Sequence, residues 1–180
     1  RGRNETAIAD LVAFLAASGL RIGEALPLTW DAVNIGEGLV NVKREKRGVN
    51  PWVAITPELE NQLRDMQTRR SETGWLFPSP LDATKHRERR PVNRRIRAAC
   101  NELGLPLVTP HGLRSYYVTQ CRQSGLTDSE IAMLIGDKTG AAIIAHTYGD
   151  LRDDHLLAQA RRVRHAITPT GNALYQRLTN

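Results

Sequence analysis

Residues 109–114 read Thr109-Pro110-His111-Gly112-Leu113-Arg114. A threonine followed by a proline is a typical helix start, in which Thr109 caps the helix and Pro110 occupies its first turn. Residues three apart share one face of a helix, so His111 and Arg114 point the same way. The free backbone N–H groups and the dipole at this end of a helix favour an anion. A phosphate there would meet a guanidinium fork and an imidazole donor together.

Arg21 lies in a second informative stretch, Ser18-Gly19-Leu20-Arg21-Ile22-Gly23-Glu24-Ala25-Leu26. Glu24 follows Arg21 by three residues, which places the two side chains on one face of a short helix. Two interpretations are open from these residues alone. The pair is either a surface ion pair that contributes little to stability, or a device that holds the Arg21 fork toward a phosphate.

Tyr148 stands in the stretch Ile144-Ala145-His146-Thr147-Tyr148-Gly149-Asp150. A tyrosine near a helix end usually packs at the edge of the core. As a nucleophile it would attack a phosphodiester, provided that neighbouring cations stabilise the phenolate and the developing charge. Three other tyrosines compete for that role: Tyr116, Tyr117 and Tyr175. The first two fall inside the helix that carries His111, where they look like packing residues.

The hydrophobic pattern predicts a mainly α-helical protein with one small antiparallel β-sheet, an α+β fold class. Strands are expected at 39–43 and 52–55, joined by the polar connection 44–50 as a β-hairpin. A largely irregular loop is expected over 71–90 because it contains Gly74, Pro78 and Pro80. Helices are expected over residues 5–18, 21–27, 57–70, 91–103, 109–121, 127–135, 141–148 and 152–167, with a short one around Tyr175.

The composition fits an ordinary folded domain. The chain has 180 residues, of which 41% are hydrophobic and 24% charged, so intrinsic disorder is not expected. Its apolar stretches are shorter than the roughly 18 residues that a membrane span needs. The two cysteines, Cys100 and Cys121, make no disulfide framework, and no Cys/His spacing resembles a zinc site, so we expect an intracellular protein without a metal or cofactor.

The positive charge is concentrated in one segment. The net charge of the chain is +6, and the segment 85–97 alone reaches that value with seven basic residues and Glu88. Such a patch on an otherwise neutral body favours a polyanionic partner. The alternative is a solvated basic loop and helix face.

The order of these motifs resembles the catalytic domain of the tyrosine recombinases, the phage integrase family. The segment 18–26, a lysine-bearing hairpin, the segment 109–114, the segment 131–136 and Tyr148 follow one another as in that family. The resemblance extends from about Glu5 to Arg164. It implies the fold of the DNA breaking-rejoining enzymes.

In that family a tyrosine attacks a DNA phosphodiester, leaving a 3′-phosphotyrosine link and a free 5′-hydroxyl, without metal or ATP. The resemblance implies Tyr148 as the nucleophile, and Arg21 and Arg114 as the arginines that clamp the non-bridging oxygens. His111 matches the histidine that donates to the phosphate and helps to move the tyrosine proton. Glu24 matches the acidic residue that supports the first arginine.

Two positions match the family less simply. A hairpin lysine usually protonates the leaving 5′-oxygen, and Lys46 is favoured here over Lys43. Asp137 stands where the family has histidine, sometimes tryptophan, and an ionised carboxylate cannot donate to a phosphate and repels it. Lys138, which is also a candidate DNA-binding residue, or His146 could take over that role.

The partner implied by the resemblance is double-stranded DNA. The helix 91–103 carries Arg94, Arg95 and Arg97, which are expected to contact phosphates and give affinity more than sequence readout. Arg161, Arg162 and Arg164 could extend this surface. The helix from Arg152 onward either docks onto a neighbouring protomer, as in family members, or packs on its own domain.

The expected organisation is a single catalytic domain, residues 1–180, with a core at about 5–150 and a C-terminal helical segment at about 151–180. The N-terminal core-binding domain of the family is expected to be absent from this chain. We expect this chain to be a monomer and the full enzyme to be a homotetramer on DNA, with DNA-bending accessory proteins as further partners. The expected location is the bacterial or phage-infected cytoplasm, in association with the nucleoid and not with a membrane.

Three other interpretations compete with a recombinase. Residues 126–136 followed by a second helix are also typical of a helix-turn-helix regulator. Such a regulator has no need for Arg21, His111, Arg114 and Tyr148 together, whereas a catalytic site must bring them within reach of one phosphate. A type IB topoisomerase shares the tyrosine chemistry, and an inactive family member would be consistent with Asp137.

Overall fold

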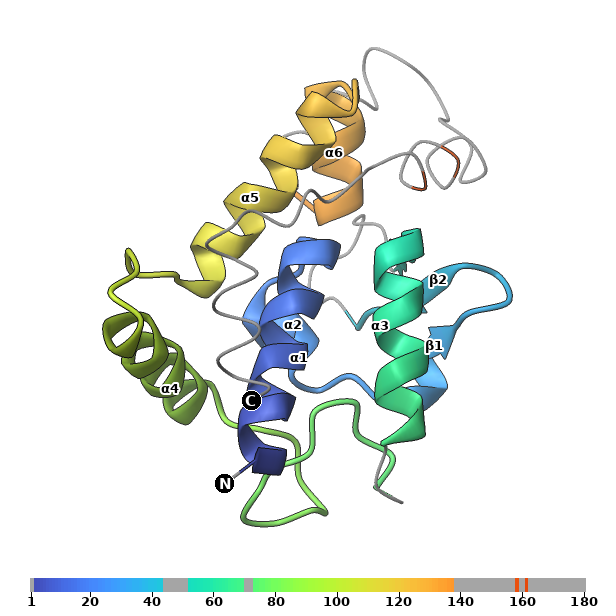
Figure 1. Ribbon diagram of the computed structural model, residues 1–180. Coiled ribbons are helices and arrows are strands. Elements are labelled where there is room, and N and C mark those ends of the chain that lie inside the picture. The colour runs from blue at the N-terminus through green and yellow to red at the C-terminus, as the bar shows by residue number, and fades with distance from the viewer. Residues whose placement is uncertain (1, 44–51, 70–72, 138–157, 159–160, 162–180) are drawn as a thin grey trace.

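The computed structural model describes residues 2–43, 52–69, 73–137, 158 and 161. These residues form six α-helices, one short 3₁₀ helix and a three-stranded sheet (Figure 1). The α-helices are α1 (Gly2–Ser18), α2 (Ile22–Ala25), α3 (Pro57–Thr68), α4 (Arg89–Glu102), α5 (Pro110–Gln123) and α6 (Asp128–Ile135). The 3₁₀ helix is η1 (Trp30–Ala32), and the strands are β1 (Val33–Asn34), β2 (Leu39–Asn41) and β3 (Trp52–Ala54). The predicted α+β class is therefore confirmed.

The helix ends follow local capping. Thr109 accepts a hydrogen bond from the Gly112 N–H at 3.0 Å, and Thr56 caps α3 in the same way. Thr127 and Glu130 form a reciprocal capping box at the start of α6. Each of these three starts was expected from the sequence. Pro91 lies two residues inside α4, because the first helical N–H groups need no intrahelical acceptor and a proline is tolerated there.

The sheet is antiparallel with the order β1-β2-β3. β2 pairs with β3 in a register that places Val40 opposite Val53 and Leu39 opposite Ala54. β1 was not expected, because a strand of two residues carries too little alternation to stand out from a loop. All three residues of β3 are buried, so both faces of the sheet are covered at this strand.

Two hydrophobic clusters lie on the two faces of the sheet. The first cluster contains Val40 and Val53 together with buried residues of α1, α3 and α4, among them Leu11, Leu15, Leu59, Leu63, Val92 and Ile96. The second cluster contains Trp52 and Ala54 together with Tyr117, Cys121, Leu126, Ile131, Leu134 and Ile135. In Figure 1, α5 and α6 lie beside the C-terminal end of α1. The join between α1 and α5 therefore brings the two clusters together.

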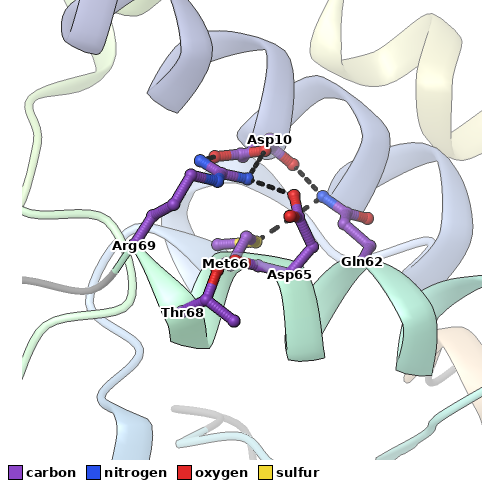
Figure 2. A network of polar contacts seen from close by, with 6 residues as sticks. All are labelled: Asp10, Gln62, Asp65, Met66, Thr68 and Arg69. Carbon is purple, nitrogen blue, oxygen red and sulfur yellow. Dashed lines mark hydrogen bonds and ion pairs between the residues drawn. The ribbon is translucent and has the colours of Figure 1, made fainter.

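A polar network holds α3 against α1 (Figure 2). Asp10 is only 4% exposed, and its carboxylate accepts from Arg69 Nη1 at 3.0 Å and from Nη2 at 3.3 Å. Arg69 also pairs with Asp65 at 2.6 Å, and Gln62 Nε2 donates to the Asp10 carbonyl at 2.6 Å. Burial raises the pKa of the Asp10 carboxyl above its usual value, while the hydrogen bonds and charge of Arg69 oppose that rise. The network fixes the middle of α1, the helix that leads to Arg21.

Candidate active site

Arg114 lies on the second turn of α5 and is 8% exposed. Its Nη1 donates to the carbonyl oxygen of Gly19 at 2.7 Å. The two residues are 95 positions apart in the sequence. A buried guanidinium is a strong donor, and this bond places the chain that follows α1 against α5. Since Arg21 follows Gly19 by two residues, the two arginine segments of the sequence analysis lie side by side.

Arg21 precedes the first residue of α2 and acts as its N-cap position. The Glu24 carboxylate accepts from the Arg21 backbone N–H at 2.9 Å and from its Nη1 at 3.3 Å. The expected pair between Arg21 and Glu24 is therefore present. The Arg21 side chain remains 51% exposed. The pair braces the guanidinium at one end and leaves it accessible to a ligand from solvent.

His111 occupies the first turn of α5 and is exposed. The Thr109 cap holds this turn in helical form, so His111 lies one turn before Arg114 on the same helix face. Residues at this spacing have Cβ atoms about 5–6 Å apart. The start of α5 therefore presents an imidazole beside the Arg114–Gly19 contact, at a helix end that favours anions.

Asp137 follows the C-terminal end of α6. Gly136 adopts the left-handed conformation with φ of 67°, and the Asp137 N–H donates to the Ala132 carbonyl at 2.8 Å. These bonds form a Schellman motif, which fixes the direction of the chain at this point. Asp137 is half-buried.

Of the remaining candidate site residues, one lies within the described residues and four lie outside them. Lys43 is exposed and follows β2. Lys46, Lys138, His146 and Tyr148 lie outside the described residues, so their predicted roles stay predictions.

The basic segment 85–97 does not form the single patch that its composition suggests. Arg87 is 6% exposed and donates to Asn4 Oδ1 at 2.7 Å, and Lys85 pairs with Asp82 at 2.9 Å. Arg95 is held inside the fold by Glu5 at 2.6 Å and Glu102 at 3.2 Å. The exposed arginines of the segment are Arg89, Arg90, Arg94 and Arg97. The expected patch is thus smaller than its sequence charge, and Arg95 serves first to join α4 to α1.

One residue of the C-terminal segment is described in contact with the rest of the chain. Arg161 Nη2 donates to the Glu37 carbonyl at 2.9 Å, in the turn between β1 and β2. The other residues of the helix expected from Arg152 onward, apart from residue 158, lie outside the described residues, so both interpretations of that segment stay open. Arg161 therefore makes one contact within the fold and remains exposed, and its part in a DNA surface stays a prediction.

Two residues near the site were not singled out by sequence reasoning. Gly19 has a φ of 64°, a conformation that favours glycine. The ring of Tyr117 lies directly against it, because a Cβ built on Gly19 would come within 2.8 Å of Tyr117 Cγ and 3.0 Å of Cε1. The sequence held a partial signal only for Gly19, a glycine directly after a helical run.

Neither a metal cluster nor a membrane helix is found in the part of the chain that the structure describes. Within residues 2–43, 52–69 and 73–137, no three His, Cys, Asp or Glu side chains gather as metal ligands would. Over the same ranges, none of the helices combines the length and the apolar character that crossing a bilayer requires.

The arrangement is that of a small α+β domain in which a hydrogen bond from Arg114 joins the segment of Arg21 to α5 near a helix start, an arrangement suited to a phosphoryl group. Among solved structures, the crystal structure of the XerA recombinase has a TM-score of 0.67 at 24% identity and covers 92% of this chain and 61% of its own. The integrase from mycobacterium phage Brujita gives 0.65 at 18% identity and covers 100% of this chain and 58% of its own. The fold is that of the tyrosine recombinase and integrase catalytic domains.

The family follows from the sequence comparison. The family model described as the phage integrase family matches residues 3–154. The relative named "Putative integrase/recombinase y4eF" from Sinorhizobium fredii is 31% identical over 137 residues, which are 72% of this chain and 51% of that protein. The "TnP I resolvase" of Bacillus thuringiensis is 29% identical and is covered over 44% of its length. The chain belongs to the phage integrase family, and it spans about half the length of these curated relatives.

Proposed function

We propose that this chain is the catalytic part of a site-specific DNA recombinase that cleaves and rejoins DNA through a 3′-phosphotyrosine intermediate. The observation that carries the proposal is the hydrogen bond from Arg114 Nη1 to the Gly19 carbonyl at 2.7 Å. It joins the segment of Arg21 to the helix start that holds His111. A helix-turn-helix regulator built on residues 126–136 and the helix after them has no need for Arg21, His111 and Arg114 together.

The proposed step is a transesterification. The phenol oxygen of Tyr148 attacks the phosphorus of a DNA phosphodiester, the P–O5′ bond breaks, and the protein is linked to the 3′-phosphate. The phenol loses its proton, and the leaving 5′-oxygen gains one. The 5′-hydroxyl of another strand then reverses the step, so no energy source is consumed.

Cationic side chains supply the charge stabilisation in this scheme. Arg21 and Arg114 hold the non-bridging oxygens, on which negative charge grows in the transition state. His111 donates to the same group, and Glu24 keeps Arg21 in place. Lys46, or alternatively Lys43, donates the proton to the 5′-oxygen. These side chains take the part that Mg²⁺ plays in other phosphoryl transfers, so we propose a reaction without metal or ATP.

Two of the three tyrosines that compete with Tyr148, Tyr116 and Tyr117, are poorly suited as the nucleophile, and the third, Tyr175, lies outside the described residues. Tyr117 is 1% exposed in the second hydrophobic cluster. Burial raises the pKa of Tyr116, which makes its phenolate harder to form. Both therefore pack, as the sequence analysis expected.

Double-stranded DNA is the proposed partner. Arg94 and Arg97 of α4 are exposed and free to meet phosphates, and Lys138 is a further candidate. A structural neighbour supports the proposal, since the Tn1549 transposon integrase, at a TM-score of 0.61, was solved in complex with circular intermediate DNA. We further propose that the full-length enzyme assembles as a homotetramer on two DNA duplexes. We also propose that it acts in the cytoplasm, where its DNA substrate is located.

The test is covalent capture. The chain is incubated in EDTA with a library of nicked duplexes of random sequence, quenched with SDS, and the DNA-linked peptide is mapped by mass spectrometry. The expected result is a linkage at Tyr148 that is absent in Tyr148→Phe, with sequences enriched in the captured DNA. A linkage at another tyrosine, a requirement for Mg²⁺, or binding without any linkage would contradict the proposal.

A further inference from the structure

Gly19 lies where the two hydrophobic clusters meet. Leu15 and Leu20, on either side of it, are fully buried in the first cluster. Tyr117, whose ring covers it, belongs to the second cluster. The two arginines of the site are also on different elements, because Arg21 caps α2 after the end of α1 whereas Arg114 belongs to α5. The geometry of Gly19 therefore sets where the two arginines lie relative to each other.

Two side chains of α5 contact Gly19. Arg114 donates to its carbonyl oxygen, and the Tyr117 ring packs on its Cα. They are three residues apart and so share a helix face. The hydrogen bond fixes the distance between the chain and α5, and the ring blocks the movement of the chain toward the second cluster.

The ring and the hydroxyl of Tyr117 contact different residues. The hydroxyl is hydrogen-bonded to Cys121, one turn further along α5. Burial raises the pKa of the Cys121 thiol to about 12, so this partner stays a neutral thiol at physiological pH. The three atoms nearest to a Cβ built on Gly19 are all ring carbons of Tyr117. A phenylalanine would keep that contact, whereas an aliphatic side chain would not.

We propose that Tyr117 is a positioning residue, which holds Gly19 and through it aligns Arg21 with Arg114 on one phosphate. The inference rests on the proposed function for its catalytic consequence. Tyr117 touches neither DNA nor the reacting atoms in this scheme. Its ring supplies the flat surface that a left-handed glycine can approach closely, and no residue with a Cβ could replace Gly19 beneath it.

The first experiment compares Tyr117→Leu and Tyr117→Phe with the wild type. The rate of covalent linkage to a captured nicked duplex and the affinity for it are measured together with unfolding in urea. Tyr117→Leu is expected to lower the linkage rate about ten-fold or more with DNA affinity within about twofold, since small displacements in a site cost up to ~100-fold. Tyr117→Phe is expected to keep the linkage rate within about twofold of the wild type.

The matched control is Leu134→Ala, a buried residue of the same cluster that belongs to α6. It should lower stability at least as much as Tyr117→Leu and leave the linkage rate unchanged once both are folded. If Tyr117→Leu loses stability but keeps the rate, or if Leu134→Ala loses the rate equally, Tyr117 is a core residue only and the proposal is wrong.

The second experiment does not depend on catalysis. Inorganic phosphate is titrated into the ¹⁵N-labelled chain, and the Nε–Hε resonances of Arg21 and Arg114 are followed. In the wild type both should shift with one common dissociation constant, and in Tyr117→Leu the two should no longer respond together. A common constant retained in the variant overturns the positioning role. A wild type that shows the common constant but forms no linkage overturns the proposed function and leaves this inference standing.

Discussion

Asp10 and Arg69 show how much a single contact decides in this domain. The Asp10 side chain is 5% exposed, and the two Arg69 nitrogens are the charge partners that oppose the cost of its burial. Removing one member of a buried ion pair leaves the other charge uncompensated, which costs more than the pair contributes. Since Asp10 lies on α1, the position of Arg21 depends indirectly on this pair.

We predict that Arg69→Met destabilises the domain by about 2 kcal/mol at neutral pH. Without Arg69, burial raises the pKa of Asp10 further above its unfolded value of about 3.9. The folded form then binds the proton more readily, so the contribution of Asp10 to stability is present at low pH and is lost as pH rises through the folded pKa. Urea unfolding at about pH 5 and about pH 7.5 measures this.

The control for that variant is Arg64→Met on the same helix. Arg64 pairs with Glu60 at 2.8 Å, but both side chains are well exposed at 59% and 40%. Its loss should change the stability by less than about 0.5 kcal/mol, without a new pH dependence. An Arg69→Met variant that behaves like Arg64→Met would show that Asp10 is solvated or paired in another way.

Asp137 gives a second prediction about one residue. If its carboxylate lies beside the scissile phosphate, Asp137→Asn removes a repulsion of the order of 1–3 kcal/mol and raises the rate of covalent linkage by about five-fold to 150-fold. Asp137→His should raise it further, since a ring N–H can donate. Asp128→Asn removes the same charge at the other end of α6, where Asp128 is 77% exposed, and should leave the rate unchanged. Equal rates for all three variants would place Asp137 outside the site.

Three helices of this domain, α3, α5 and α6, start where threonine caps predict, and the start of α5 is also the proposed phosphate site. Thr109 and Thr127 make the same bond, each accepting from the backbone N–H three residues later, at 3.0 Å and 3.2 Å. Thr127 is therefore a matched control for Thr109, because Thr109 lies at the proposed site and Thr127 does not.

Thr109→Ala and Thr127→Ala should each destabilise the domain by about 1 kcal/mol. Only Thr109→Ala frays the turn that holds His111, so only it should also lower the linkage rate. Unfolding in urea and single-turnover linkage separate the two effects. Equal rates for the two variants would mean that the first turn of α5 has no part in the chemistry.

The sequence predicted elements well and contacts between them poorly, for a physical reason. Caps, the Thr-Pro starts and the Arg21–Glu24 pair are encoded within three or four residues, and all are present. The contact of Tyr117 with Gly19 and the Asp10–Arg69 pair join residues far apart, and helical spacing carries no information about them. The same limit explains Arg95, whose charge suggested DNA but whose partners Glu5 and Glu102 could be seen only in the fold.

The distribution of charge over the whole molecule bears on its DNA affinity. Each phosphate contact releases counterions, so the logarithm of affinity falls with the logarithm of salt concentration by about 0.9 per contact. Arg94 and Arg97 are exposed, whereas Arg95 is held in ion pairs at 22% exposure. Three neighbouring arginines of α4 thus have different expected effects.

We predict that Arg94→Ala and Arg97→Ala each weaken binding to duplex DNA and reduce the salt slope by about one. Arg95→Ala should instead lower the stability of the domain and leave the slope unchanged. Fluorescence anisotropy over a salt series, with urea unfolding of the same samples, makes the comparison. A slope that falls for Arg95→Ala and not for the other two would reverse the assignment of this helix.

The proposed mechanism depends on one phosphate being held by Arg21 and Arg114, whose segments are joined by the hydrogen bond from Arg114 to the Gly19 carbonyl. A crystal structure of the chain with a captured duplex and orthovanadate in place of the scissile phosphate tests this directly. We predict that Arg21 and Arg114 both place guanidinium nitrogens about 3 Å from oxygens of the same vanadate, with the Arg114–Gly19 hydrogen bond retained. Arginines that contact different phosphates, or an Arg114 that has left Gly19 to reach the vanadate, would contradict the account.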